Sequence, residues 1–301
     1  MTTELKTKNA KAVIASEGAE LKLLVIGGRE IMWCGDPAFW GKTSPVLFPA
    51  IGNVKNNKTI IDGKEISLTK HGFARDNTFT TVRKSGNSLI LQYKYAPVKN
   101  GYPYSVELCL QYNLFDDRIE ICYSVFNPEY HSIPFCIGAH PAIACDDLDN
   151  CTLVFEKREK ASTPVMDLNT RLFRSKERIQ RLDGSSKLPL SYDMFDNDVV
   201  YFDNIKSRAV KLVQGKKTLA CIAFEGFETL GLWTPAGKRA GFICIEPWCG
   251  SDDYDDDSGI FKEKKGIQIL EGKKFARYKM VISAQSAIAV ISAVPVIRPQ
   301  N

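Results

Sequence analysis

Hydrophobic and polar residues alternate with a period of two over much of this chain. The alternation is clearest in residues 88–95, 106–112 and 119–125, where apolar side chains share one face and polar side chains the other. This pattern is typical of half-buried antiparallel strands. Turn-forming residues stand between these stretches, as in Lys99-Asn100-Gly101 and Phe115-Asp116-Asp117. The chain therefore predicts consecutive β-hairpins.

Shorter strand candidates continue in the second half of the chain, and only Leu168 to Leu182 has a weakly helical pattern. These candidates are Cys151 to Glu156, Val199 to Asp203, Ala209 to Val213, Leu219 to Phe224 and Phe242 to Glu246. Successive strands without alternating helices favour an all-β fold, a large antiparallel β-sandwich, over a parallel α/β sheet. Gly27-Gly28 lacks the glycine spacing of a dinucleotide-binding turn.

No internal repeat or linker divides the 301 residues, so we expect a single domain over 1–301. Its core should extend from about 13 to 282, and the tail 283–301 has no assigned role. The net charge of +5 comes from dispersed lysines and arginines, which argues against a nucleic-acid partner. The start of the chain lacks an apolar signal, and Ala287 to Ile297 is shorter than the ~20 residues that span a bilayer. We expect a cytoplasmic protein with no membrane partner.

The cysteines and acidic residues give no sign of a metal or cofactor. None of the nine cysteines forms a C-x-x-C pair, so reduced cysteines in the core are favoured over disulfides or a zinc site. The acidic run from Ser251 to Gly259 fails the EF-hand pattern, since Ser258 and Lys264 stand where that loop needs glycine and glutamate. We interpret the run as a solvated loop.

Three histidines are available for proton transfer near neutral pH. His131 lies in a polar turn and is expected to be solvated. His71 opens the segment H-G-F-A-R-D, in which Gly72 permits close approach of a ligand and Arg75 can bind oxygen acceptors. His140 precedes Pro141, which restricts its backbone to extended conformations. Both His71 and His140 are equally compatible with purely structural roles, as a loop cap and as a core histidine.

Glu246 ends the apolar run Gly241 to Ile245 and precedes Pro247. Alternation places it on the face of Phe242 and Cys244, where burial would raise the pKa of its carboxyl and suit it to act as a base. A buried ion pair with Arg75 or a lysine is the structural alternative. Trp248 and Trp233 offer flat apolar faces for a sugar ring, although tryptophans in β proteins more often belong to the core.

Five motifs in a fixed order resemble the aldose 1-epimerase (galactose mutarotase-like) superfamily, and more narrowly its bacterial branch associated with lactose operons. They are S-P-V-L-F-P (Ser44 to Pro49), H-G-F-A-R-D (His71 to Asp76), P-F-C-I-G-A-H-P-A (Pro134 to Ala142), F-D-N-D (Phe195 to Asp198) and I-E-P-W-C-G (Ile245 to Gly250). Two earlier stretches, Gly18 to Leu21 and Trp33 to Trp40, also fit, so the similarity runs from about Val13 to about Ile282.

The resemblance implies interconversion of the α and β anomers of a free aldose on the concave face of a sheet, without metal or cofactor. Glu246 would be the general base and His140 the general acid. His71, Arg75, Asp198 and Trp248 would bind the sugar. In many relatives an arginine stands where this chain has Asn53, which can still hydrogen-bond a hydroxyl but lacks the guanidinium fork.

Several alternatives stay open on sequence grounds. Arg75 with Lys55 would favour a phosphorylated hexose over a free one. A catalytically weak sugar-binding or sensing protein of the same fold is the second hypothesis, although both His140 and Glu246 are present. A glycoside hydrolase is disfavoured because such enzymes usually need two carboxylates. The chain is expected to be a monomer or a homodimer.

Overall fold

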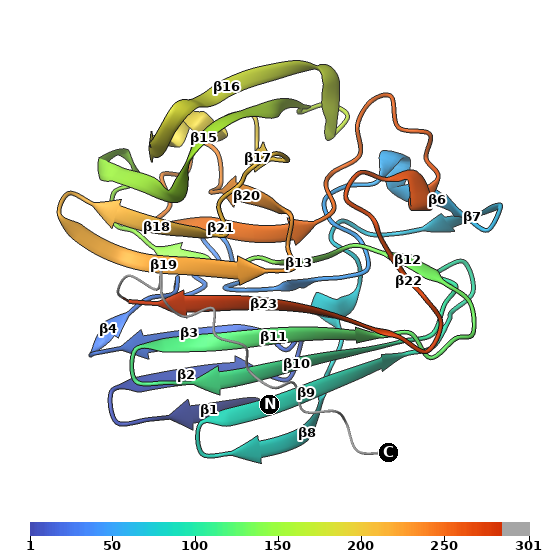
Figure 1. Cartoon of the computed structure of the whole chain (residues 1–301), viewed down its shortest axis with the longest axis horizontal. Helices are drawn as coiled ribbons and strands as arrows, with labels where there is room; N and C mark the ends of the chain where they lie inside the picture. The colour runs from blue at the N-terminus through green and yellow to red at the C-terminus, as the bar shows by residue number, and fades with distance from the viewer. Residues whose placement is uncertain (285–301) are drawn as a thin grey trace.

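The computed structural model describes residues 1–284, and strands dominate it (Figure 1). All pairings between the named strands are antiparallel, which confirms the predicted all-β class and antiparallel sheets. No helix in this range is long and apolar enough to cross a membrane. Apart from Ser283 and Ala284, the tail to which the sequence assigned no role lies outside the described residues.

The largest sheet has nine strands. They are β8 (Thr80–Ser85), β9 (Ser88–Tyr95), β10 (Val106–Leu114), β11 (Arg118–Phe126), β15 (Cys151–Asp167), β16 (Leu172–Pro189), β18 (Ala209–Gln214), β19 (Lys217–Glu225) and β23 (Phe275–Ser283). Their order across the sheet is β16-β15-β18-β19-β23-β11-β10-β9-β8. The alternation predicted from the sequence is confirmed in β10, where Val106, Leu108, Leu110 and Tyr112 are buried.

The expected helix between Leu168 and Leu182 is wrong. Asp167 ends β15, a short turn follows, and Leu172 begins β16, which pairs along most of its length with β15. Hydrogen bonding to a long neighbouring strand satisfies the backbone of this segment, and that tertiary pairing overrides a weak local periodicity.

The remaining strands form four smaller sheets. A four-stranded sheet contains β1 (Thr2–Lys6), β2 (Ala10–Ala15), β3 (Leu21–Ile26) and β4 (Arg29–Glu30). A six-stranded sheet contains β5 (Val46–Leu47), β13 (Ile137–Ala139), β14 (Ala142–Ala144), β17 (Val200–Phe202), β20 (Thr229–Trp233) and β21 (Phe242–Cys249). Two pairs complete the set, β6 (Lys58–Ile61) with β7 (Lys64–Ser67) and β12 (Ile133–Phe135) with β22 (Gln268–Leu270).

The helical residues of the described chain form five short 3₁₀ helices. These are η1 (Lys55–Asn57), η2 (Ala74–Asp76), η3 (Leu148–Asn150), η4 (Tyr192–Phe195) and η5 (Phe261–Glu263).

The main core fills the space between the layers of sheet. Figure 1 shows β1 to β3 behind the nine-stranded sheet, and β2 contacts β10 while β14 contacts β19. The largest apolar cluster accordingly draws buried side chains from Leu5 near the start of the chain to Ile282 in β23. The six-stranded sheet thus has one face on this core, and its other face is available for a site.

The register of β21 fixes the opposition of two side chains. Gly138 of β13 pairs with Trp248, and Ala142 of β14 pairs with Cys244. The two short strands therefore run along β21 in one continuous register, which places His140 directly opposite Glu246. The ladder is interrupted there because Pro141 has no N–H to donate. Its carbonyl still accepts a hydrogen bond from the Ile245 amide at 3.1 Å.

Glycines on both neighbouring strands make room for the indole of Trp248. A Cβ on Gly138 would lie 2.6 Å from Cδ1 of Trp248, and one on Gly231 of β20 would lie 3.0 Å from its benzene ring. The indole consequently lies across both strands. It forms part of a second apolar cluster with Tyr201, Phe173 and Tyr254, on the face of the six-stranded sheet that points away from the main core.

Gly138→Ala should destabilise the protein by about 1–3 kcal/mol, because the added methyl group overpacks the contact with Trp248. The free energy of unfolding in urea measures this loss. Gly86→Ala is the matched control, since a Cβ at Gly86 meets nothing within 4 Å and should change stability by less than about 0.5 kcal/mol. Equal stabilities of the two variants would contradict the packing described for Trp248.

Candidate active site

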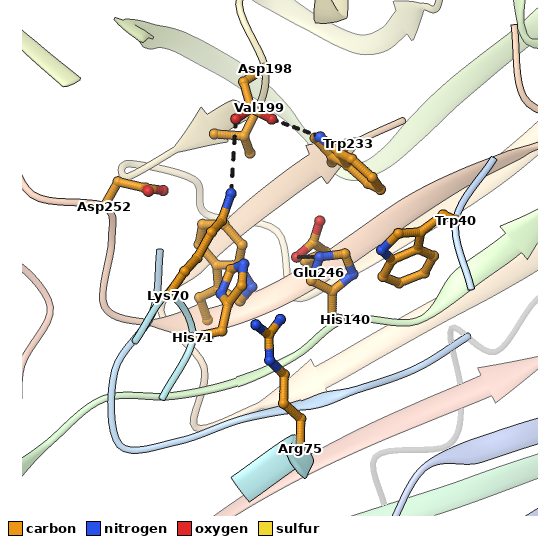
Figure 2. Close-up of a pocket in the computed structure, with 11 residues that line it drawn as sticks. Trp40, Lys70, His71, Arg75, His140, Asp198, Val199, Trp233, Glu246 and Asp252 are labelled. Atoms are coloured by element: carbon orange, nitrogen blue, oxygen red, sulfur yellow. Dashed lines mark hydrogen bonds and ion pairs between the residues drawn. The ribbon is translucent and has the colours of Figure 1, made fainter. Parts of the chain in front are cut away.

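A cavity of about 200 Å³ opens on the outer face of the six-stranded sheet (Figure 2). It is lined by Trp40, Lys70, His71, Arg75, His140, Asp198, Val199, Trp233, Glu246, Trp248 and Asp252. Six of the seven site residues expected from the sequence lie here, although they come from segments far apart in the chain. Asn53 is the exception. Among the other lining residues, Trp233 was weighed only as a possible sugar platform, and Lys70, Asp252 and Trp40 had no expected site role.

His140 and Glu246 are in contact at the inner end of this cavity. Nε2 of His140 lies 3.1 Å from Oε2 of Glu246, and the two side chains are 8% and 1% exposed. In the described part of the chain, no donor hydrogen-bonds either oxygen of Glu246, and Nδ1 of His140 also has no partner. Among the described residues, the one ion-pair contact of Glu246 is thus with His140, not with Arg75 or a lysine.

Burial disfavours the charged form of both partners. It raises the pKa of Glu246 well above its ordinary value and lowers the pKa of His140 to about 3. Both shifts favour the uncharged state of the pair, in which it holds one titratable proton rather than none or two. A carboxyl and an imidazole that share one proton always present one acid and one base.

His71 is held in a fixed tautomer beside the pair. Its backbone lies in the left-handed region, with φ of 65°, and its ring is 5.7 Å from the ring of His140. Nδ1 of His71 accepts a hydrogen bond from the Gly52 amide at 3.1 Å. Burial, followed by the charge of Lys70, holds the pKa of His71 well below its ordinary value. The neutral ring therefore carries its proton on Nε2 as a donor.

Asp198 and Lys70 form the polar rim drawn in Figure 2. Oδ1 of Asp198 accepts a hydrogen bond from the indole N–H of Trp233 at 2.7 Å. Oδ2 lies 3.9 Å from Nζ of Lys70 and 3.4 Å from Nη1 of Arg171. Asp198 thus keeps acceptor capacity beside two cations, in a geometry fixed by Trp233.

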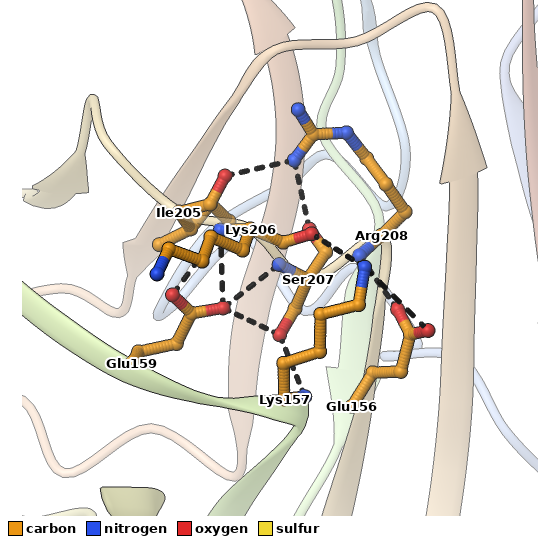
Figure 3. A network of polar contacts seen from close by, with 7 residues as sticks. All are labelled: Glu156, Lys157, Glu159, Ile205, Lys206, Ser207 and Arg208. Carbon is orange, nitrogen blue, oxygen red and sulfur yellow. Dashed lines mark hydrogen bonds and ion pairs between the residues drawn. The ribbon is translucent and has the colours of Figure 1, made fainter. Parts of the chain in front are cut away.

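The chain after Asp198 is anchored by a buried carboxylate, that of Glu159 (Figure 3). Glu159 accepts hydrogen bonds from the amides of Lys206 and Ser207 and from the Ser207 hydroxyl, the last at 2.6 Å. The guanidinium of Arg208 donates to the carbonyls of Ile205 and Ser207. This network fixes the turn that joins β17 to β18. It therefore also fixes the C-terminal end of β17, the short strand that begins two residues after Asp198.

Arg75 extends from η2 with its guanidinium toward the two histidines (Figure 2). Its nearest acidic group is Asp76, with Nε 3.7 Å from Oδ2, and Nε has no hydrogen-bond partner among the described residues. This long contact with Asp76 leaves the guanidinium of Arg75 available to a ligand in the cavity.

Aromatic rings enclose the acid–base pair. The indole of Trp40 stacks on the imidazole of His140 with ring centroids 5.0 Å apart, and Trp233 meets the same ring edge-on at 5.9 Å. Trp248 supplies a further wall. Apolar rings of this kind exclude water and suit the C–H face of a sugar.

The acidic segment predicted to be a solvated loop is instead partly buried, and that prediction is wrong for Asp252 and Asp253, which are 3% and 4% exposed. Asp253 pairs with Lys264. Asp252 accepts hydrogen bonds from the backbone and side-chain N–H groups of Asn53 at 2.6 Å and 2.8 Å. The amide of Asn53 is thus directed at Asp252, and Asn53 does not line the cavity.

Three described residues on this face combine the atoms and spacing needed to hold a metal ion. One ligand atom each of His140, Cys244 and Glu246 lies within 4.8 Å of the other two. Imidazole, thiolate and carboxylate together suit a cation such as Zn²⁺. Such a cation would compete with the shared proton of the pair for the same atoms.

Comparison with known proteins agrees with the fold and with the family that the motifs resemble. The sequence model described as "Aldose 1-epimerase" matches residues 1–281. Protein LacX of Lactococcus lactis subsp. lactis, in its plasmid form, is 30% identical over 281 residues, which cover 89% of this chain and 94% of LacX. The chromosomal form of LacX matches to the same extent.

Two solved structures are similar to the chain over nearly its whole length. A galactose mutarotase related enzyme from Lactobacillus acidophilus superimposes with a TM-score of 0.87 at 25% identity, covering 97% of this chain and 100% of that one. A galactose mutarotase-like protein from Lactobacillus casei ATCC 334 gives 0.84 at 25% identity, with coverage of 94% and 99%. Together with the family match, which extends over most of the sequence, these likenesses confirm the resemblance of the five motifs, and this chain belongs to the aldose 1-epimerase family.

Proposed function

We propose that this protein interconverts the α and β anomers of a free hexose by opening and reclosing the sugar ring. The observation that carries the proposal is the opposition of His140 and Glu246, whose Nε2 and Oε2 atoms lie 3.1 Å apart on the wall of a cavity. Anomerisation moves one proton from the anomeric hydroxyl and one to the ring oxygen. One acid and one base on adjacent strands suit that exchange.

The single titratable proton of the pair first passes from Glu246 to Nε2 of His140 across their 3.1 Å contact. Glu246 then takes the proton from the anomeric hydroxyl, and His140 protonates the ring oxygen. The C1–O5 bond then breaks and leaves an aldehyde, which turns about the bond between C1 and C2. On reclosure the O5 hydroxyl returns its proton to His140, while Glu246 protonates the oxygen at C1. The pair regains its starting state, so no co-reactant is consumed.

The remaining polar groups of the cavity bind and orient the sugar. His71 donates from Nε2, Asp198 accepts from a hydroxyl, and Arg75 donates from its guanidinium. Trp248 and Trp40 provide apolar faces. Asn53 is not part of this set, because its side-chain amide donates to Asp252 and it does not line the cavity.

Charge and size favour a neutral monosaccharide. Lys55, which sequence paired with Arg75 for a phosphate, directs its ammonium to the carbonyl of Asp255 and does not line the cavity. The charges of Lys70 and Arg75 are balanced by Asp198 and Asp252, so a dianionic phosphate would find no net attraction in the cavity. A cavity of about 200 Å³ is also smaller than the ~300–1,000 Å³ typical of pockets for drug-sized ligands.

Glu246→Gln and His140→Asn should each lower the rate of mutarotation by ~10²-fold or more. Each substitution removes a proton-transfer group but keeps the approximate shape of the side chain, so sugar affinity should change far less than kcat. Polarimetry of freshly dissolved α-galactose and α-glucose, corrected for the spontaneous rate, measures the effect.

Cys244→Ser is the matched control for these variants. Cys244 lies on the same face of β21 and is fully buried, but it has no part in the proposed proton transfer. It should keep a rate within about threefold of wild type. Wild-type rates in both Glu246→Gln and His140→Asn would exclude the acid–base assignment, and sugar binding without turnover in the wild type would favour a sensing protein.

The pH dependence of kcat/KM should show a broad plateau across neutral pH. On the acid side, a second proton enters the pair as pH falls toward the pKa of His140 of about 3, and the base is lost. On the alkaline side, the single proton leaves as pH rises through the raised pKa of Glu246, and the acid is lost. An acid limb centred near the ordinary histidine pKa of about 6.5 would contradict the buried, one-proton pair.

A further inference from the structure

We propose that Asp252 is a sugar-binding residue that accepts a hydrogen bond from one ring hydroxyl and so helps to select the hexose. The inference rests on the proposed function, because it assumes that a sugar occupies the cavity. It goes beyond that function in naming a recognition contact that neither the sequence motifs nor the proton-transfer chemistry includes.

Two successive backbone amides hold Asp252 and His71 at the cavity. The Gly52 amide donates to Nδ1 of His71 at 3.1 Å, and the next amide, that of Asn53, donates to Oδ1 of Asp252 at 2.6 Å. Gly52 lies in the left-handed region with φ of 64°, and a Cβ there would be 2.2 Å from Cγ of Asp252. This residue must therefore be glycine for the carboxylate to lie where it does.

The hydrogen bonds leave half of the carboxylate free. The backbone and side-chain donors of Asn53 both bind Oδ1, and no other donor among the described residues binds Asp252. Asp252 is 3% exposed, lines the cavity, and points its carboxylate inward in Figure 2. Burial raises the pKa of Asp252, while the charge of Lys70 and the hydrogen bond from Asn53 oppose that shift. An acceptor oxygen without a protein donor thus faces the space of the ligand.

Asp252 offers the sugar a hydrogen-bond acceptor, whereas a guanidinium would offer donors. An arginine in place of Asn53 would donate to sugar oxygens, whereas Asn53 here uses its donors to orient an acceptor. The side of the cavity lined by His71 and Asp252 therefore offers one donor, Nε2 of His71, and one acceptor, Oδ2 of Asp252. A hydroxyl that donates to Asp252 fits this arrangement.

A series of hexoses with one hydroxyl at a time replaced by fluorine tests the proposal, because fluorine cannot donate a hydrogen bond. Affinities are measured by quenching of intrinsic fluorescence, since Trp40, Trp233 and Trp248 line the cavity. In the wild type one replacement should weaken binding by about tenfold or more through loss of a hydrogen bond to a charged group. In Asp252→Asn the same replacement should cost less than about threefold, because an amide can donate toward fluorine.

Asp256→Asn is the matched control: it makes the same chemical change in the same segment, but at an exposed residue that does not line the cavity. This variant should lose as much affinity as the wild type when the same hydroxyl is replaced by fluorine. Asn53→Ala, which removes one of the two donors to Asp252, should reduce the penalty only in part. An unchanged penalty in Asp252→Asn, or no position with a penalty above about threefold in the wild type, overturns the proposal.

The fluorescence experiment requires no turnover, so its failure is distinct from failure of the proposed function. A protein that binds hexoses with the expected fluorine penalty but does not speed anomerisation would retain the role of Asp252 and lose the enzymatic proposal. A protein that speeds mutarotation, but whose loss of affinity for the fluorinated sugars does not depend on Asp252, would retain the enzymatic proposal and lose the role of Asp252.

Discussion

The buried contact between His140 and Glu246 is the interaction on which the site depends. An imidazole and a carboxyl so far from water cannot easily carry their usual charges. Each is tolerated because the other lies 3.1 Å away and because burial favours the uncharged form of both groups. That constraint costs stability, since Glu246 lacks any hydrogen-bond donor in the described chain, but it supplies an acid and a base at neutral pH.

The sheet provides the precision that this contact needs. A single register along β21 sets His140 against Glu246, and a cross-strand position is fixed by backbone hydrogen bonds rather than by a flexible loop. Glycines at positions 138 and 231 clear the space beside Trp248. Around this rigid centre, the segment at Gly52 and Asn53 uses adjacent backbone amides to orient His71 and Asp252.

Much of this arrangement could be predicted from the sequence. Period-two alternation identified β9, β10 and β11, and the ordered motifs identified His71, His140 and Glu246. The long strand β16 was missed because its pairing with β15, not its own pattern, makes it a strand. Asp252 was missed because a run of acidic residues is typical of a solvated loop, and its burial depends on Asn53, 199 positions away in the chain. Lys70 directly precedes the His71 to Asp76 motif and Trp40 ends the Trp33 to Trp40 stretch, and this proximity was the only sequence signal that they belong to the site.

The protonation state of His140 tests the shared-proton pair most directly. Nitrogen-15 NMR of the imidazole, assigned by comparison with His140→Asn, reports whether the ring gains a positive charge. We predict that the His140 signals of the unliganded wild type show no titration between about pH 5 and 8, the range in which an unperturbed histidine changes charge. A full titration with a midpoint near 6.5 would contradict the buried pair and the mechanism built on it.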